Sequence, residues 1–170
     1  MSKIANSPTW PPVWVTLPPG GVCIMELWEL TARERVRDNY AAYTHAGDRG
    51  RLDDLAAVFA EDGVLHVAGQ EPAVGRQAII SMLTGAVERG STPDDQGRRG
   101  LVRHFIANIR FEEMTRTEIH TAAYFLVVTG RGPDHWGRYR DRHVAVGDEW
   151  KIAHRYVRID TVMPGATFAT

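Results

Sequence analysis

The sequence predicts a single α+β domain in which three N-terminal helices pack against a curved, mostly antiparallel sheet. Two observations carry this prediction. Apolar residues recur at helical spacing in the first half of the chain, whereas the second half consists of strand-like runs separated by short turns. Helices followed by strands within one chain of 170 residues are typical of the α+β class, and this length suffices for one substantial core.

Residues 1–27 are expected to form an extended N-terminal arm. Five prolines within residues 7–20 fix φ and remove backbone donors, which excludes regular structure there. Trp10 and Trp14 make the arm too apolar for a free tail, so we expect it to pack on its own domain or on a neighbouring subunit. Met25 offers an alternative translation start.

The first helix is predicted over Thr31–Gly47. Thr31 and Glu34 fit a capping box at its start, and Gly47 is of the type that ends a helix. A second, shorter helix is predicted over Leu52–Ala60, because its apolar residues share one side.

After the second helix, one more strand and one more helix are predicted before the chain becomes rich in strands. A strand is predicted over Val64–Val67, and a third helix after Gly75 carries apolar residues on one side, namely Ile79, Ile80, Leu83 and Val87. Beyond the polar loop at 90–100, hairpin-linked strands are predicted over residues 101–112, 117–129, 136–146 and 149–161. The domain is therefore expected to span 28–161, with 162–170 as a C-terminal tail.

Composition excludes several classes of function. The formal net charge of −1 provides no electrostatic footprint for nucleic acid or an anionic membrane, so neither is expected as a partner. Cys23 is the only cysteine and the histidines show no ligand spacing, so we expect neither a metal site nor a cofactor. No apolar run approaches the ~20 residues of a membrane span. No signal-peptide pattern is present, so a cytoplasmic protein is expected.

Three stretches, taken in order, resemble the SnoaL-like branch of the NTF2-like superfamily. The first runs from Tyr43 and Asp48 to the Phe-Ala-Glu-Asp-Gly run at residues 59–63, the second opens with His104, and the third covers residues 137–155. The set is similar to enzymes of the scytalone dehydratase, bile-acid dehydratase, dehydrochlorinase and polyketide cyclase types. This resemblance implies a cone-shaped fold, with the curved sheet wrapped around its longest helix.

The resemblance also implies roles for particular residues. Asp48 and His104 take the places of an acid–base dyad, in which a buried carboxylate fixes the tautomer of an imidazole that titrates near neutrality. Tyr43 takes the place of an assisting tyrosine, and Tyr139 is expected to donate to an oxygen that gains charge. The sequence departs from the family at Thr129, near which scytalone dehydratase carries a second catalytic histidine.

Each of these residues also has an ordinary structural explanation. Asp48 suits the turn between Gly47 and Gly50, His104 suits any half-buried strand, and Tyr139 suits the packing of a sheet. The catalytic interpretation becomes stronger than the structural one only because Asp48 and His104 occur together, at the positions that the family resemblance gives them.

Strand alternation from His104, and the family register elsewhere, predict a largely apolar cavity that binds a small molecule. Its lining is expected to include Val67, Ile106, Asn108, Phe125, Val127, Arg155, Val157 and Ile159. For Arg155 two roles stay open, because it can hold an anionic group of a ligand or pair with Asp141. Of the two roles we favour the ion pair. Asp141 and Asp160 are interleaved with the arginines between residues 138 and 158, which predicts strand faces of mixed charge.

These observations predict a cofactor-independent lyase, first of all a dehydratase, or an isomerase for a small, largely apolar or polycyclic carbonyl compound. Cyclisation of a polyketide begins with the same proton abstraction and is an alternative. A non-catalytic ligand-binding module and a partner subunit like the β subunit of ring-hydroxylating dioxygenases also remain open. We expect a homo-oligomer, dimer or trimer, because one face of the sheet needs cover.

Overall fold

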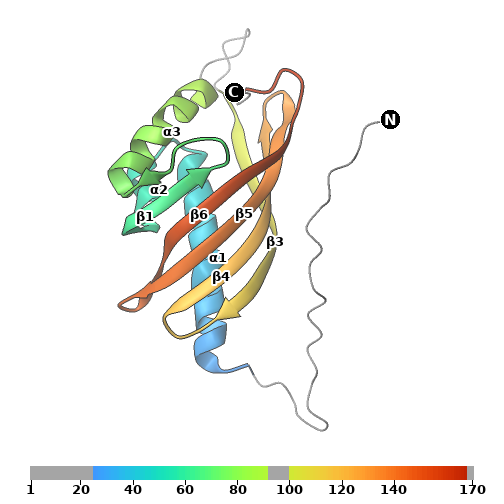
Figure 1. Ribbon diagram of the computed structural model, residues 1–170. Helices are drawn as coiled ribbons and strands as arrows, with labels where there is room; N and C mark the ends of the chain where they lie inside the picture. Colours follow the sequence, from blue (N-terminus) through green and yellow to red (C-terminus); the bar gives the residue numbers. More distant parts are fainter. Residues whose placement is uncertain (1–24, 92–99, 168–170) are drawn as a thin grey trace.

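A computed structural model describes residues 25–91 and 100–167 (Figure 1). The helices are α1 (Leu27–Gly47), α2 (Leu52–Ala57) and α3 (Arg76–Ser91). The strands are β1 (Phe59–Val67), β2 (Ala73–Val74), β3 (Val102–Met114), β4 (Glu118–Thr129), β5 (Gly132–Val146) and β6 (Glu149–Val162). The proposed placement of the N-terminal arm falls almost entirely outside the described residues.

The strands form one sheet in the order β2-β1-β6-β5-β4-β3. The pairing of β1 with β6 is parallel, and every other pairing is antiparallel. Figure 1 shows the long strands β3 to β6 curving across α1, with α2 and α3 beside the end formed by β1 and β2. The α+β class and the mostly antiparallel sheet are therefore confirmed.

The face of the sheet that packs on α1 forms the core. Alternate residues of β4 are buried, as the period of two along a strand requires: Ile119, Thr121, Ala123, Phe125, Val127 and Thr129. One apolar cluster joins α1 to this face, and a second joins the end of α1 to α2, β1 and α3. Between these clusters the helix end, the sheet and α3 surround a cavity.

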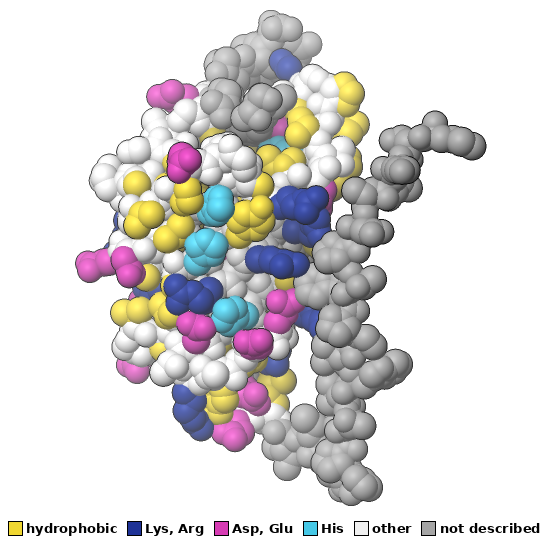
Figure 2. All heavy atoms as spheres, viewed as in Figure 1, with side chains coloured by type: hydrophobic (Ala, Val, Ile, Leu, Met, Phe, Trp, Pro, Cys, Tyr) yellow, Lys and Arg dark blue, Asp and Glu magenta, His cyan; other side chains and the backbone are white. Residues whose placement is uncertain are grey.

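The opposite face of the sheet carries polar side chains of both charges (Figure 2). Arg138 donates to Asp160 at 2.9 Å, and Arg142 donates to Glu118 at 3.1 Å. This arrangement matches the mixed-charge strand faces that the interleaved arginines and acidic residues predict. No described helix is long and apolar enough to cross a membrane.

The first helix begins earlier than predicted. It starts at Leu27, where Glu26 and Glu29 form the capping box. Thr31 lies inside the helix, and its hydroxyl donates to Leu27 O at 2.9 Å. The Thr31–Glu34 capping box is therefore wrong, because a threonine within a helix satisfies its hydroxyl on the preceding turn instead.

Two strand starts also differ from the prediction. Strand β1 begins at Phe59, so α2 ends at Ala57 and the expected helix over Leu52–Ala60 is too long. Strand β5 begins at Gly132 instead of residue 136, which places Asp134 and His135 within the sheet. The short strand β2 was not predicted, because two residues give no periodicity to detect.

Candidate active site

A cavity of about 720 Å³ lies between the end of α1, the helices α2 and α3, and the inner face of the sheet. This volume lies within the range of small-molecule sites. Among its walls, the residues with ionisable or hydroxyl groups include Tyr43, Asp48, His104, His135 and Tyr139, and much of the remaining lining is aliphatic. The site is therefore an apolar cavity with a few polar groups.

Asp48 is held at the C-terminal end of α1. Its backbone N–H donates to Thr44 O at 2.9 Å. The turn that follows places Gly50 at φ +68°, a conformation that favours glycine. This turn directs the Asp48 carboxylate, only 10% exposed, towards β3.

His104 lies near the start of β3, which is the edge strand of the sheet. Backbone N–H groups on the outer edge of such a strand have no partner in the ladder. That of His104 donates to the two carboxylate oxygens of Asp48 at 3.2 and 3.3 Å, and the ring Nδ1 lies 2.6 Å from Asp48 Oδ1. Asp48 thus holds both the backbone and the ring of His104, and Nε2 is the ring nitrogen left for a ligand.

Tyr43 on α1 and Tyr139 on β5 also line the cavity. Their rings meet edge to face at 6.3 Å, and Tyr139 stacks on Phe125 at 4.6 Å. Burial raises the pKa of Tyr43, and burial together with the nearby Tyr43 raises the pKa of Tyr139 well above its ordinary value. Both hydroxyls therefore stay protonated at neutral pH and are available as hydrogen-bond donors.

Arg155 does not line the cavity. It is fully buried behind the tyrosines, with its guanidinium 4.3 Å from the Tyr43 ring centroid and 4.4 Å from that of Tyr139. It donates two hydrogen bonds to Asp141, at 2.7 and 3.0 Å. Burial disfavours its charge, but Asp141 more than compensates and raises the pKa of Arg155. The predicted ion pair is confirmed, and the role in ligand contact is wrong.

Most of the other predicted wall positions face the cavity, namely Val67, Phe125, Val127, Val157 and Ile159. Ile106 points inward but packs on the core cluster of α1 and β4. Asn108 is exposed, with φ +53°, in the irregular stretch of β3 between Ala107 and Arg110. Its placement in the cavity is wrong, because this bulge interrupts the alternation on which the prediction depended.

His135 was not predicted as a site residue. It lines the cavity from β5, and its Nδ1 lies 2.8 Å from the carboxylate of Asp134. The sequence predicts a strand that begins at Trp136, which leaves His135 outside the predicted sheet. The signal in the sequence is the Asp-His dipeptide directly before a strand, which by itself is common.

A model of the SnoaL-like domain matches residues 28–156 of the chain. No curated protein matches it significantly.

Solved structures share the fold. A candidate scytalone dehydratase from Novosphingobium aromaticivorans has a TM-score of 0.68 at 23% identity, over 80% of this chain and 89% of that one. LinA has a TM-score of 0.68 at 17% identity, over 85% and 97% of the two chains. A protein from Catenulispora acidiphila, solved in complex with S-DNPA, has a TM-score of 0.64 at 28% identity, over 75% and 92%.

Proposed function

This chain belongs to the SnoaL-like domain family, and from that premise we propose that it is a cofactor-independent acid–base lyase or isomerase for a small, largely apolar carbonyl compound. The observation that carries the proposal is the Asp48–His104 pair. Its two side chains lie 2.6 Å apart in the wall of a cavity of about 720 Å³. A histidine in a cleft, held by a partly buried carboxylate, is a candidate for general-base chemistry.

In the proposed reaction His104 takes a proton from the carbon next to the substrate carbonyl. The Nδ1–H group of its ring donates to Asp48, so Nε2 carries the lone pair that accepts the proton. The electron pair of the broken C–H bond moves to the carbonyl oxygen and forms an enolate. Asp48 then stabilises the imidazolium. When the carbonyl forms again, the electron pair held in the enolate becomes the new conjugated C=C bond. The C–O bond of the hydroxyl group on the next carbon breaks with its electron pair on oxygen, which takes the proton back from the His104 imidazolium and leaves as water.

Tyr43 and Tyr139 are the proposed donors to the enolate oxygen. Their raised pKa values keep both hydroxyls protonated, and a donor in an apolar site stabilises developing negative charge more than it does in water. The apolar side chains of Phe125, Val127 and Val157 would contact the body of the substrate.

The cavity also bears on the rival interpretations. A partner subunit without chemistry of its own is expected to have a filled cavity, and the volume found here argues against that. A passive binding module has no need of an Asp–His pair in its wall, so the pair favours an enzyme. Cyclisation would begin with the same proton abstraction as dehydration, and the mass of the product separates the two.

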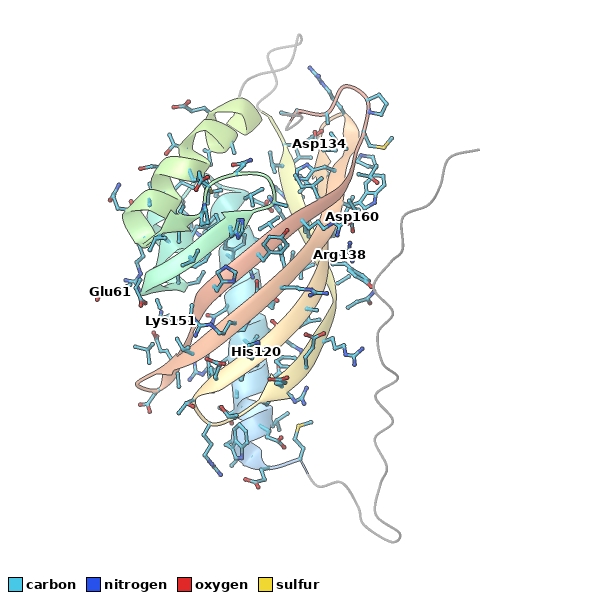
Figure 3. The ribbon with its side chains drawn as sticks, viewed as in Figure 1. Glu61, His120, Asp134, Arg138, Lys151 and Asp160 are labelled. Carbon is cyan, nitrogen blue, oxygen red and sulfur yellow. The ribbon has the colours of Figure 1, made fainter. Side chains whose placement is uncertain are left out.

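The test is to incubate the protein with a panel of β-hydroxy ketones and short poly-β-ketones and to measure the masses of the products by mass spectrometry. Dehydration yields a product lighter by one water, whereas an isomerisation or a simple ring closure leaves the mass unchanged. His104→Ala should lower turnover by at least ~10²-fold if His104 is the general base. The matched control is His120→Gln, since His120 lies on the outer face of the sheet and pairs with Glu118 (Figure 3). Full activity of the His104 variant would contradict the mechanism.

A further inference from the structure

An ion pair lies buried behind the tyrosines of the cavity and has no part in the proposed reaction. Arg155 and Asp141 are both buried, and neither lines the cavity. Taking two charges out of water is costly, and well-packed apolar residues of similar volume often serve stability equally well. Stability alone is therefore a weak reason for this pair, and its contacts with the tyrosines of the site point to a second role.

Three tyrosine rings surround the Arg155 guanidinium. Its central carbon lies 4.9 Å from the ring centroid of Tyr40, 4.3 Å from that of Tyr43 and 4.4 Å from that of Tyr139. A cation over an aromatic face is attracted to it, and more strongly where water is excluded. Tyr40 does not line the cavity, and its hydroxyl pairs with that of Thr121 at 2.9 Å. Tyr43 and Tyr139 do line it, so Arg155 holds two rings of the wall from behind.

One nitrogen of the guanidinium is left over from the ion pair. Nε and Nη2 donate to the Asp141 carboxylate at 3.0 and 2.7 Å. Nη1 is buried and has no hydrogen-bond partner among the residues that the structure describes. A buried donor without an acceptor is costly, so an oxygen that can accept from Nη1 lowers the free energy of the site.

The two tyrosines of the cavity differ in what acts on their hydroxyls. Burial raises the pKa of both. After burial, the strongest influence on the pKa of Tyr43 is Arg155, which lowers it, whereas for Tyr139 it is the nearby Tyr43, which raises the pKa further. A hydroxyl that gives up its proton more readily is the stronger donor to an oxygen that gains negative charge. Tyr43 is therefore the better suited of the two as a donor to an enolate.

The chemistry of arginine also determines where the Tyr43 proton can point. A guanidinium donates hydrogen bonds and accepts none. An N–H group of Arg155 can therefore only donate to the Tyr43 oxygen, and the single proton of that hydroxyl has to point elsewhere. Because Tyr43 borders the cavity, this proton is available to an oxygen of the substrate.

We propose that Arg155 is a positioning residue of the site, which donates from Nη1 to the Tyr43 oxygen and thereby makes the Tyr43 hydroxyl the principal hydrogen-bond donor to the enolate. The inference rests on the proposed function. Asp141 keeps the guanidinium in place through its two hydrogen bonds. Arg155 does not contact the substrate and transfers no proton. Its positive charge strengthens the Tyr43 donor most when the carbonyl oxygen becomes an enolate, which is where a donor accelerates the reaction.

The test is a double-mutant cycle on proton abstraction. Arg155→Met together with Asp141→Asn removes the ion pair without leaving a buried charge. Tyr43→Phe removes the hydroxyl but keeps the ring that packs on residue 155. The probe is the β-hydroxy ketone formed from benzaldehyde and acetone, and NMR in D₂O measures exchange of the hydrogens between its carbonyl and its hydroxyl-bearing carbon.

Tyr43→Phe should slow this exchange by at least ~10²-fold, because an oxyanion donor is lost. Removing the ion pair should slow it by ~10-fold in the wild-type protein and by less than about twofold in Tyr43→Phe, where the hydroxyl through which Arg155 acts is missing. The same factor in both backgrounds would show that the ion pair acts only on the structure, and would overturn the proposal. So would exchange at the wild-type rate in the variant that lacks the pair.

Thermal unfolding of each variant shows whether the fold is kept, and His120→Gln, on the outer face of the sheet, is the matched control (Figure 3). If the variant without the ion pair does not fold, Arg155→Lys replaces it in the same cycle with the same two outcomes. Lysine keeps the charge beside Asp141 but lacks the fork of donors that can serve Asp141 and Tyr43 together.

The outcomes also separate this proposal from the proposed function. If the wild-type protein exchanges no α-hydrogen, or if exchange survives in His104→Ala, the proposed function fails and this inference fails with it. If exchange depends on His104 but the cycle between the ion pair and Tyr43 is additive, only the role of Arg155 is overturned.

Discussion

His143 and His104, two of the histidines that lie close to aspartates, have different surroundings. His143 is completely buried between α1 and the sheet, where its Nε2 lies 3.0 Å from the Thr121 hydroxyl and 3.9 Å from Asp141. Asp141 is already engaged by Arg155. Burial lowers the pKa of His143 to about 4, so it stays neutral near pH 7. It is a packed core residue.

His104 differs in what its carboxylate contacts and in what its ring faces. Among the residues that the structure describes, the Asp48 side chain hydrogen-bonds only the backbone and ring of His104, and the ring borders a cavity. A positive charge that forms on this ring therefore has the Asp48 carboxylate beside it as a counterion, and the cavity leaves room for a substrate next to the ring. The comparison indicates that an Asp close to a His is not by itself enough to make a candidate acid–base pair. The free volume beside the ring and the other partners of the carboxylate decide the role.

The largest expected effect on stability comes from breaking the buried ion pair between Arg155 and Asp141. Arg155→Met leaves Asp141 buried without its partner, which should cost about 3–5 kcal/mol of unfolding free energy. The measurement is denaturant unfolding of the purified variant. Adding Asp141→Asn to Arg155→Met should restore much of the loss, and equal stability of the single variant and the wild-type protein would contradict the account.

The second prediction concerns pH. In the unfolded chain His143 titrates near its ordinary pKa of 6.5, and in the folded protein near 4, so between these values the unfolded state binds more protons. Its contribution to stability is complete above pH 6.5 and is lost as the pH falls towards 4, by up to ~1.4 kcal/mol per pH unit. His143→Gln should flatten this dependence in unfolding experiments from pH 7 to 4. The same slope in the variant would show that other groups cause it.

The smallest effect is expected at Asn108, which the structure removes from the cavity. Asn108→Ala should cost about 1 kcal/mol of stability, because alanine tolerates positive φ less well than asparagine. Asn108→Gly should be close to neutral. Neither substitution should change turnover of a substrate, and kinetic assays beside thermal unfolding check both points. A loss of activity without a loss of stability would show that Asn108 does contribute to the site, and would contradict this assignment.

The sequence was sufficient for the fold class, for the Asp48–His104 pair and for most of the apolar wall. These features depend on patterns that are regular along the chain, namely helical periodicity, strand alternation and the order of the family motifs. The errors occur where that regularity is interrupted. A bulge in β3 turns Asn108 outward, and in β5 an extra residue, Asp134, lies directly before His135 of the cavity wall. The prediction that Arg155 lies on the inner side of the sheet is correct. Only its contact with Asp141 shows that its side chain is buried in an ion pair.

The most direct test of the central claim is the tautomer of His104, measured by long-range ¹H–¹⁵N NMR correlation of the histidine rings. The account predicts that the neutral His104 ring carries its proton on Nδ1, and that Asp48→Asn changes this tautomer. The ¹⁵N shift of Nε2 should change when a conjugated ketone, the proposed type of product, is added. His143 should be insensitive to the same ketone. A proton on Nε2 of the neutral His104 ring in the wild-type protein would contradict its assignment as the general base.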